Sequence, residues 1–167
     1  MTLIHSFLPV EDDKAEKLVL GSMPGKASLA AGQYYAHPRN LFWPIMGELT
    51  GAQPGLPYEE RLRILKANRI ALWDVLASCV RKSSMDARIE TSSEIINDFE
   101  SFFLNHPRIA HVFFNGRKAE QSFCKKVAPL LKSRELNYHL LPSTSPAYAS
   151  LSYKDKLDIW RELIRDR

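Results

Sequence analysis

The segment KLVLG at residues 17–21 is the first of four short apolar runs that decide the fold. Three further runs follow it along the chain: RIALWDV (69–75), RIAHVFFNG (108–116) and LNYHLLPS (136–143). Continuous apolar runs of this length are typical of strands that are buried on both faces, as in a parallel sheet. The sequence therefore predicts four buried strands.

Segments with helical patterns lie between and after these runs. We expect helices at residues 40–51, 57–68, 91–105, 116–131 and 152–167. Thr91 with Glu94, and Ser152 with Asp155, have the spacing of capping boxes, which mark helix starts. The alternation of strands and helices predicts an α/β fold of three layers, α/β/α. The length is that of one domain, so we expect residues 1–167 to form a single domain.

The composition is that of an ordinary globular protein, with 45% hydrophobic and 25% charged residues. A net charge of +4 permits a phosphate-bearing partner but does not require one. Cys79 and Cys124 form no CxxC motif, so we expect small core residues in a reducing cytoplasm and no metal site. No secretion signal and no apolar run of about 20 residues is present. We therefore expect a cytoplasmic, monomeric protein without a membrane segment.

Polar and aromatic residues gather where the four predicted strands end. The segments are GSMPG (21–25), WDVLASC (73–79), FNGRK (114–118) and PSTSPAY (142–148). In α/β folds, ligands bind beyond the carboxyl ends of the strands. Gly21 and Gly25 permit a positive φ and a close approach by a ligand. Their turn fits neither the G-x-G-x-x-G motif nor a P-loop, which disfavours dinucleotides and nucleoside triphosphates.

The segment QYYAHPRNLFW (33–43) adds aromatic groups to this edge. Tyr34, Tyr35 and Phe42 can stack on a nucleobase, although either tyrosine can equally belong to the core. Asn40 can orient a water molecule or contact a base edge, and it can also cap the helix that follows it. These residue types together favour a site for a base.

Hydroxyl, amide and charged groups complete the predicted site. Three hydroxyl groups can donate to phosphate oxygens: Ser143, Thr144 and Ser145. Asn115 can contact a base edge, or it can simply form the turn before Gly116. Arg117 begins a basic helix edge that is either solvated or a phosphate patch. Asp74 is either an acid in the site or a carboxylate that closes its loop.

The chain resembles the uracil-DNA glycosylase superfamily in four successive segments: LVLGSMPG…QYYAHPRNLFW, ALWDVLASCVRKSSMDARI, VFFNGRKA and LLPSTSPAYA. It is most similar to the hypoxanthine-DNA glycosylase branch, and the resemblance covers nearly the whole chain. It implies an α/β/α fold with a short, mostly parallel four-stranded sheet. It also implies that a deaminated base is flipped out of DNA and excised by hydrolysis, without a metal or cofactor, which leaves an abasic site.

Two positions depart from the pattern of the superfamily. Met23 stands where an Asp or Asn usually helps a water molecule to attack the sugar C1′, and Leu141 stands where uracil glycosylases often have a His. In the hypoxanthine branch a downstream asparagine positions the water, and it matches Asn40. With the motif match, we expect base contacts from Met23, Tyr34, Tyr35, Phe42, Asp74 and Asn115. We expect contacts with DNA phosphates from Gly25, Ser143, Thr144, Ser145 and Arg117.

Two alternatives stay open at this point. The first is a mismatch-specific uracil or thymine glycosylase of the same fold. The second is a catalytically inactive nucleic-acid-binding homologue, because Met23 and Leu141 are residues that an inactive glycosylase would carry. The residue that fills the vacated base stack is also open among Thr144, Tyr148 and Arg117.

Overall fold

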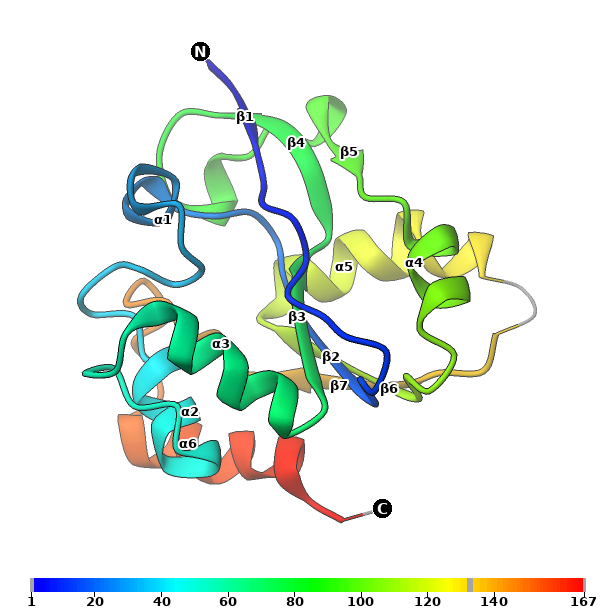
Figure 1. Ribbon diagram of the computed structural model, residues 1–167. Helices are drawn as coiled ribbons and strands as arrows, with labels where there is room; N and C mark the ends of the chain where they lie inside the picture. Colours follow the sequence, from blue (N-terminus) through cyan, green and yellow to red (C-terminus); the bar gives the residue numbers. More distant parts are fainter. Residues whose placement is uncertain (1, 132–133, 167) are drawn as a thin grey trace.

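A computed structural model describes residues 2–131 and 134–166. Its centre is a parallel sheet with the strand order β3–β2–β6–β7 (Figure 1). The strands are β2 (Lys17–Gly21), β3 (Ile70–Asp74), β6 (His111–Asn115) and β7 (Asn137–Leu141). Each lies within one of the four apolar runs, which confirms the predicted sheet. Gly21 pairs with Asp74, and Asn115 with Leu141, so all four strands end at one edge.

Helices cover both faces of this sheet. Three pack on one face: α2 (Phe42–Thr50), α3 (Tyr58–Ala67) and α6 (Tyr153–Trp160). Two pack on the other: α4 (Phe99–Asn105) and α5 (Arg117–Lys126). Alternate strand residues point to the two cores; Val19 and Phe113 belong to the first core, and Leu18 and Phe114 to the second. The predicted three-layer α/β/α fold is confirmed.

A second, smaller sheet was not predicted. It is antiparallel, with the order β1–β4–β5, and lies above the central sheet in Figure 1. Its strands are β1 (Thr2–His5), β4 (Leu76–Arg81) and β5 (Ile95–Ile96). The sequence predicts a loop for residues 76–79, because β4 has no continuous apolar run. The pairing partners of β4 are distant in sequence, so no local signal marks this strand.

The helix predicted at residues 91–105 begins only at Phe99. Asp98 caps it, since its carboxylate accepts a hydrogen bond from the Ser101 amide at 3.1 Å. The residues before it form a short 3-10 turn and strand β5: Thr91–Ser93 and Ile95–Ile96. The predicted capping box fails because Glu94 pairs with Lys118 of α5 instead. A tertiary ion pair has therefore replaced the local cap.

The last two helices are shorter than predicted. Helix α5 gives way to the 3-10 turn Ala128–Leu130, and α6 gives way to the 3-10 turn Arg161–Ile164. Ser152 caps α6 and accepts a hydrogen bond from the Asp155 amide at 3.1 Å, as the predicted helix start requires. Residue 167 of the predicted helix lies outside the described residues. The short α1 (Lys26–Ala31) was not predicted.

The two cysteines differ in their surroundings. Cys79 is buried in β4, as predicted, whereas Cys124 is exposed on α5. The prediction of a core position is therefore wrong for Cys124, because it lies on a helix face that turns toward solvent. Within residues 2–131 and 134–166, no helix has the length and apolar character needed to cross a lipid bilayer.

Candidate functional site

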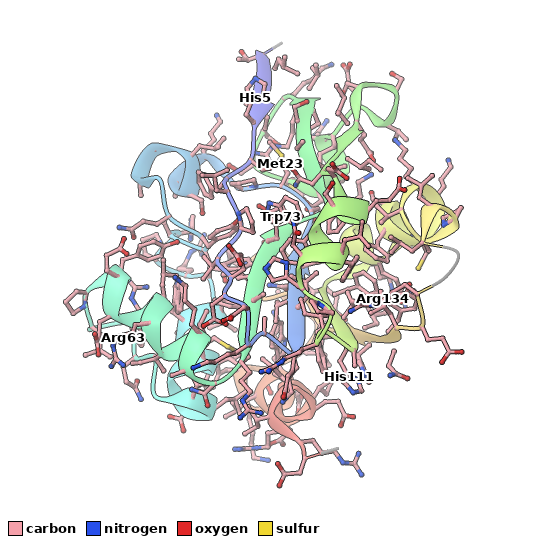
Figure 2. All side chains as sticks on the ribbon, turned by 45° about the vertical axis from the view of Figure 1, so that its right-hand side comes forward. His5, Met23, Arg63, Trp73, His111 and Arg134 are labelled. Atoms are coloured by element: carbon pink, nitrogen blue, oxygen red, sulfur yellow. The ribbon has the colours of Figure 1, made fainter. Side chains whose placement is uncertain are left out.

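A cavity of about 430 Å³ lies at the carboxyl edge of the parallel sheet. Its wall includes residues from all four strand-end loops: residues 21–28, Tyr34, Tyr35, His37, Asn40, Asp74, residues 84–87, Asn115 and residues 143–148. Figure 2 shows Met23, from the first of these loops, at the opposite end of the sheet from His111, which begins β6. The predicted convergence of the four loops is confirmed. A cavity of this size is within the usual range for small-molecule sites.

Asn40 lies half-buried at the cavity wall, directly before α2. Its Oδ1 atom accepts a hydrogen bond from the Phe42 amide at 2.9 Å. The amide of Leu41, the residue between them, donates to the Thr144 carbonyl at 3.0 Å, which ties this helix start to the serine and threonine loop. The N-cap of α2 is Leu41, so the alternative that Asn40 caps this helix is not met, although its side chain accepts from the first helical amide. Asn40 also lines the cavity, and its role toward a water molecule or a base stays a prediction.

The three predicted stacking residues occupy different places. Tyr35 is half-buried, lines the cavity and stacks on Phe42 with ring centroids 4.2 Å apart. Its φ of 55° is a strained conformation for a bulky side chain, and such strain is concentrated at functional sites. Tyr34 lines the cavity too, but it is 4% exposed and its hydroxyl donates to the Leu8 carbonyl at 2.8 Å.

Phe42 does not reach the cavity wall in this structure, and its predicted contact with a base stays a prediction. It is fully buried and packs beneath Tyr35, and it does not belong to the cavity wall. The helical position that makes Phe42 a core residue of α2 also turns it away from the cavity. Its role here is to support the ring of Tyr35.

Asn115 and Thr144 hold each other at the cavity wall. The Asn115 Nδ2 atom donates to Thr144 Oγ1 at 3.0 Å, and the Thr144 amide donates to Asn115 Oδ1 at 3.0 Å. Thr144 is 1% exposed. This structure therefore gives Thr144 a positioning role toward Asn115. Its contact with a DNA phosphate stays a prediction, and the residue that enters the base stack stays open.

The two serines of the same loop are half-buried and line the cavity. Ser143 Oγ accepts a hydrogen bond from the Ser145 amide, and Ser145 Oγ accepts one from the Ala147 amide, both at 3.2 Å. Each hydroxyl oxygen is fixed by the backbone while its own proton is left to be donated. This geometry suits a phosphate oxygen as acceptor, and the phosphate contacts of both serines stay predictions.

The glycines differ in backbone conformation. Among the described residues, the glycines with positive φ are Gly32, Gly51 and Gly116, so Gly21 and Gly25 do not use the positive φ that glycine permits. Gly21 is required for space, since a Cβ there would lie 2.6 Å from Asp74 Oδ1 and 2.8 Å from the Tyr35 hydroxyl.

Gly25 and Arg117, two predicted phosphate contacts, have contrasting positions. Gly25 lines the cavity and precedes α1, but the next amide, that of Lys26, already donates to Ser84 Oγ at 2.9 Å. Arg117 is exposed at the start of α5 and lies outside the cavity wall. Contacts of both residues with DNA phosphates stay predictions.

Asp74 ends β3 and is 3% exposed. Its Oδ2 atom has no hydrogen-bond partner among the described residues. Burial above all, and then repulsion from Asp86, raise the pKa of this carboxyl to about 7, although Arg81 opposes the rise. The loop is closed through the backbone carbonyl of Asp74, which accepts from Asn97 Nδ2 at 2.8 Å. Of the two roles considered for Asp74, this geometry favours an acid in the site.

Comparisons with known proteins bear on this site. The family model described as Uracil DNA glycosylase superfamily matches residues 8–164. The chain belongs to the uracil-DNA glycosylase superfamily. Two proteins named Hypoxanthine DNA glycosylase are similar to it, from Methanosarcina acetivorans (37% identity) and Methanosarcina barkeri (35% identity). Each match covers 96% of this chain and 98% of the relative.

A solved structure also resembles this superfamily member. It is a solution NMR structure of a Methanosarcina acetivorans protein that bears the name of a uracil DNA glycosylase. The TM-score is 0.78 at 34% identity, over 98% of this chain and 100% of the other. The two positions that depart from the superfamily pattern are both buried; Met23 lines the cavity, whereas Leu141 lies in β7 outside the cavity wall.

One wall of the glycosylase cavity was missed by the sequence analysis. Residues 84–87 lie at the start of the 3-10 turn Asp86–Arg88 and line the cavity. They are hydrogen-bonded to residues 21–28, because Ser84 Oγ accepts from the Lys26 amide and Asp86 accepts from the Ser22 hydroxyl. Their place depends on β4, which returns the chain to this edge. The sequence signals are the polar composition of residues 82–88, which an ordinary surface loop would share, and the family resemblance of the segment 71–89, which assigns these residues no role.

Proposed function

We propose that this member of the superfamily is a DNA glycosylase that removes hypoxanthine. It flips the base out of the duplex and hydrolyses the N-glycosidic bond, which leaves an abasic site. The observation that carries the proposal is that Met23 and Asn40 line the same cavity. Met23 cannot polarise water, whereas Asn40 is held in place by the Phe42 amide. The names of the two relatives, which match over almost their whole length, support the same substrate.

The cavity residues suggest how the base is held. Base flipping costs a few kcal/mol and is easiest for a poorly paired base, which a deaminated base is. Tyr35 stacks on the flipped base, and Asn115, oriented by Thr144, hydrogen-bonds its edge. Ser143 and Ser145 donate to the DNA backbone and hold the register.

The hydrolysis itself needs positioning more than a strong base. As the glycosidic bond breaks, positive charge develops on the sugar and the electron pair of the bond moves to the base. Asn40 holds a water molecule near C1′, where the water attacks a sugar that is already strongly electrophilic. An amide cannot accept a proton at neutral pH, so the contribution of Asn40 is one of position and dipole orientation.

The test is single-turnover cleavage of labelled duplexes that carry inosine or uracil at one position, with alkali to break abasic sites. We expect fast release of hypoxanthine and slow or no release of uracil. Faster release of uracil would favour a mismatch-specific uracil or thymine glycosylase. Binding to the duplex with no release from either substrate would favour an inactive nucleic-acid-binding homologue.

We further propose that the protein acts as a monomer, in the cytoplasm and as the single domain expected from the sequence. These statements stay predictions from the chain length and composition. Gel filtration of the purified protein, alone and with a duplex, tests the monomeric state.

A further inference from the structure

Two polar atoms at the base of the cavity lack hydrogen-bond partners among residues 2–131 and 134–166. They are Asp74 Oδ2 and the Tyr35 hydroxyl oxygen, and both are buried. Both residues line the cavity, and both side chains lie against the backbone of Gly21. Buried polar groups are almost always hydrogen-bonded in native proteins. An unpartnered pair in two residues that line a cavity therefore indicates a ligand that brings polar groups of its own.

The environment of Asp74 favours a proton on its carboxyl group. Burial and the negative charge of Asp86 raise the pKa of Asp74 to about 7, and Arg81 opposes this rise. The charged or titratable groups that act on the carboxyl or are acted on by it are Tyr34, Tyr35, Tyr58, Arg81 and Asp86. Tyr34 and Tyr35 stay neutral, because burial also raises the pKa of both hydroxyl groups. A protonated carboxyl can donate a hydrogen bond, whereas an ionised one can only accept.

We propose that Asp74 is the general acid of this glycosylase and protonates N7 of the departing purine. This role rests on the proposed removal of hypoxanthine and adds a catalytic residue that acts on the base. Hypoxanthine displays the same N7 and O6 acceptors as guanine. Of these, N7 belongs to the ring system that takes up the electron pair of the broken bond, so a proton there makes the leaving base neutral.

The proton and electron balance of the step is complete. The bond between C1′ and N9 breaks, and its electron pair goes to the purine while the carboxyl proton of Asp74 moves to N7. The oxygen of the water held by Asn40 bonds to C1′, and that water loses one proton to solvent. The products are neutral hypoxanthine, an abasic sugar and an Asp74 carboxylate, which solvent protonates again. Uracil has no equivalent of N7, so the same residue favours a purine.

The test compares two substrates and two proteins. The substrates are duplexes with deoxyinosine or 7-deazadeoxyinosine, in which N7 is replaced by C–H. The proteins are the wild type and Asp74→Asn, which keeps the size of the side chain but has no acidic proton. On deoxyinosine at pH 6, we expect the variant to be slower by about 100-fold, in the range of general acid catalysis. On the 7-deaza substrate, where no N7 can be protonated, the two proteins should differ by less than about 3-fold.

The pH profile gives a second readout. The single-turnover rate of the wild type should fall as the pH rises through about 7, where Asp74 loses its proton. The variant Asp86→Asn removes the repulsion that raises the pKa of Asp74, so the falling limb should move to lower pH. A structural role for Asp74 would not produce this movement.

Stability gives a readout that is independent of activity. Between pH 4 and about 7 the folded wild type holds a proton on Asp74 that the unfolded chain has released. Its stability relative to Asp74→Asn should therefore decrease as the pH rises through this window. Denaturant midpoints at four pH values measure the difference.

Three results would overturn the role of Asp74 while leaving the proposed function intact. They are an equal loss of rate on both substrates in Asp74→Asn, a wild-type rate on deoxyinosine that is flat from pH 5.5 to 8.5, and parallel stability profiles of the two proteins. A wild type that releases no hypoxanthine at any pH contradicts the proposed function instead, and this role with it.

Discussion

The polar groups at the two edges of the parallel sheet differ in how completely they are hydrogen-bonded. At the edge where the strands begin, the Arg134 guanidinium donates to four carbonyls: those of Phe103, His106, Pro107 and Ile109. Lys17, the first residue of β2, donates to the Leu163 carbonyl at 2.6 Å. At the edge where the strands end, Asp74 and Tyr35 carry buried atoms without partners among the described residues. Figure 2 shows His111, which begins β6, and Met23 at these opposite ends.

This difference separates stability from function. Groups with complete hydrogen bonding stabilise the fold, whereas buried groups left unsatisfied lower stability and are kept where a ligand will pair with them. Substitutions at the edge where the strands begin (the beginning edge) should therefore change the free energy of unfolding. Substitutions at the edge where the strands end (the ending edge) should mainly change the rate of base release.

The largest effect is expected at the ending edge, for Asn40→Ala. Without the amide that holds the water, the single-turnover rate on deoxyinosine should fall by about 10²- to 10³-fold, as for the loss of one preorganised polar group elsewhere. The matched control is Asn40→Ser, which keeps an acceptor for the Phe42 amide. Asn40→Ser should be as stable as the wild type and still slow. If either variant cleaves at nearly the wild-type rate, Asn40 is not the catalytic residue.

At the beginning edge, Arg134→Ala should lower the free energy of unfolding by about 2 kcal/mol, since several carbonyls lose a charged donor. The side chain is partly exposed, so water will satisfy some of these groups. The rate of the folded variant should equal that of the wild type. Arg134→Lys, which keeps the charge but loses the planar fork, should lie between them. A lower single-turnover rate in a fully folded Arg134→Ala variant would show that the two edges are coupled.

Thr144→Val tests how far the positioning of Asn115 matters. The substitution keeps the shape of the side chain but removes the acceptor of the Asn115 Nδ2 atom. We expect a loss of about 1 kcal/mol in stability and of about 10-fold in the single-turnover rate. The control Thr144→Ser keeps the hydroxyl and should retain most of the rate. An equal loss of rate in both variants would assign the effect to packing, and not to Asn115.

The central sheet could be predicted because its signals are local. Each of the four strands is a continuous apolar run, and parallel strands of this kind end at a common edge. The loops that follow them therefore met at the cavity, as expected. Asp74 and Asn115 were placed at the cavity in this way, because each ends a strand that the sequence marks clearly, and Asn40 was placed there because it precedes a helix with a clear apolar pattern.

The second sheet and the wall at residues 84–87 could not be predicted, because they depend on contacts between distant segments. β4 pairs with β1, more than 70 residues earlier in the chain, and this pairing carries residues 84–87 to the cavity. Phe42 lies outside the cavity wall for a related reason. The sequence shows that an aromatic ring is present near the site, but not which face of α2 it occupies.

The smallest expected effect, and the sharpest test of the comparison, is Tyr35→Phe. The hydroxyl is buried and has no partner among the described residues, so its removal should raise the free energy of unfolding, by up to about 1 kcal/mol. If a polar group of the bound DNA other than the stacked base pairs with this hydroxyl, the same change should slow base release about 5-fold, which corresponds to one hydrogen bond of about 1 kcal/mol. The ring that stacks on Phe42 is kept, so the loss cannot come from stacking. Opposite signs in stability and rate would show that this edge holds its unsatisfied groups for the substrate. A decrease in both would mean that the hydroxyl supports the fold, as the polar groups of the other edge do.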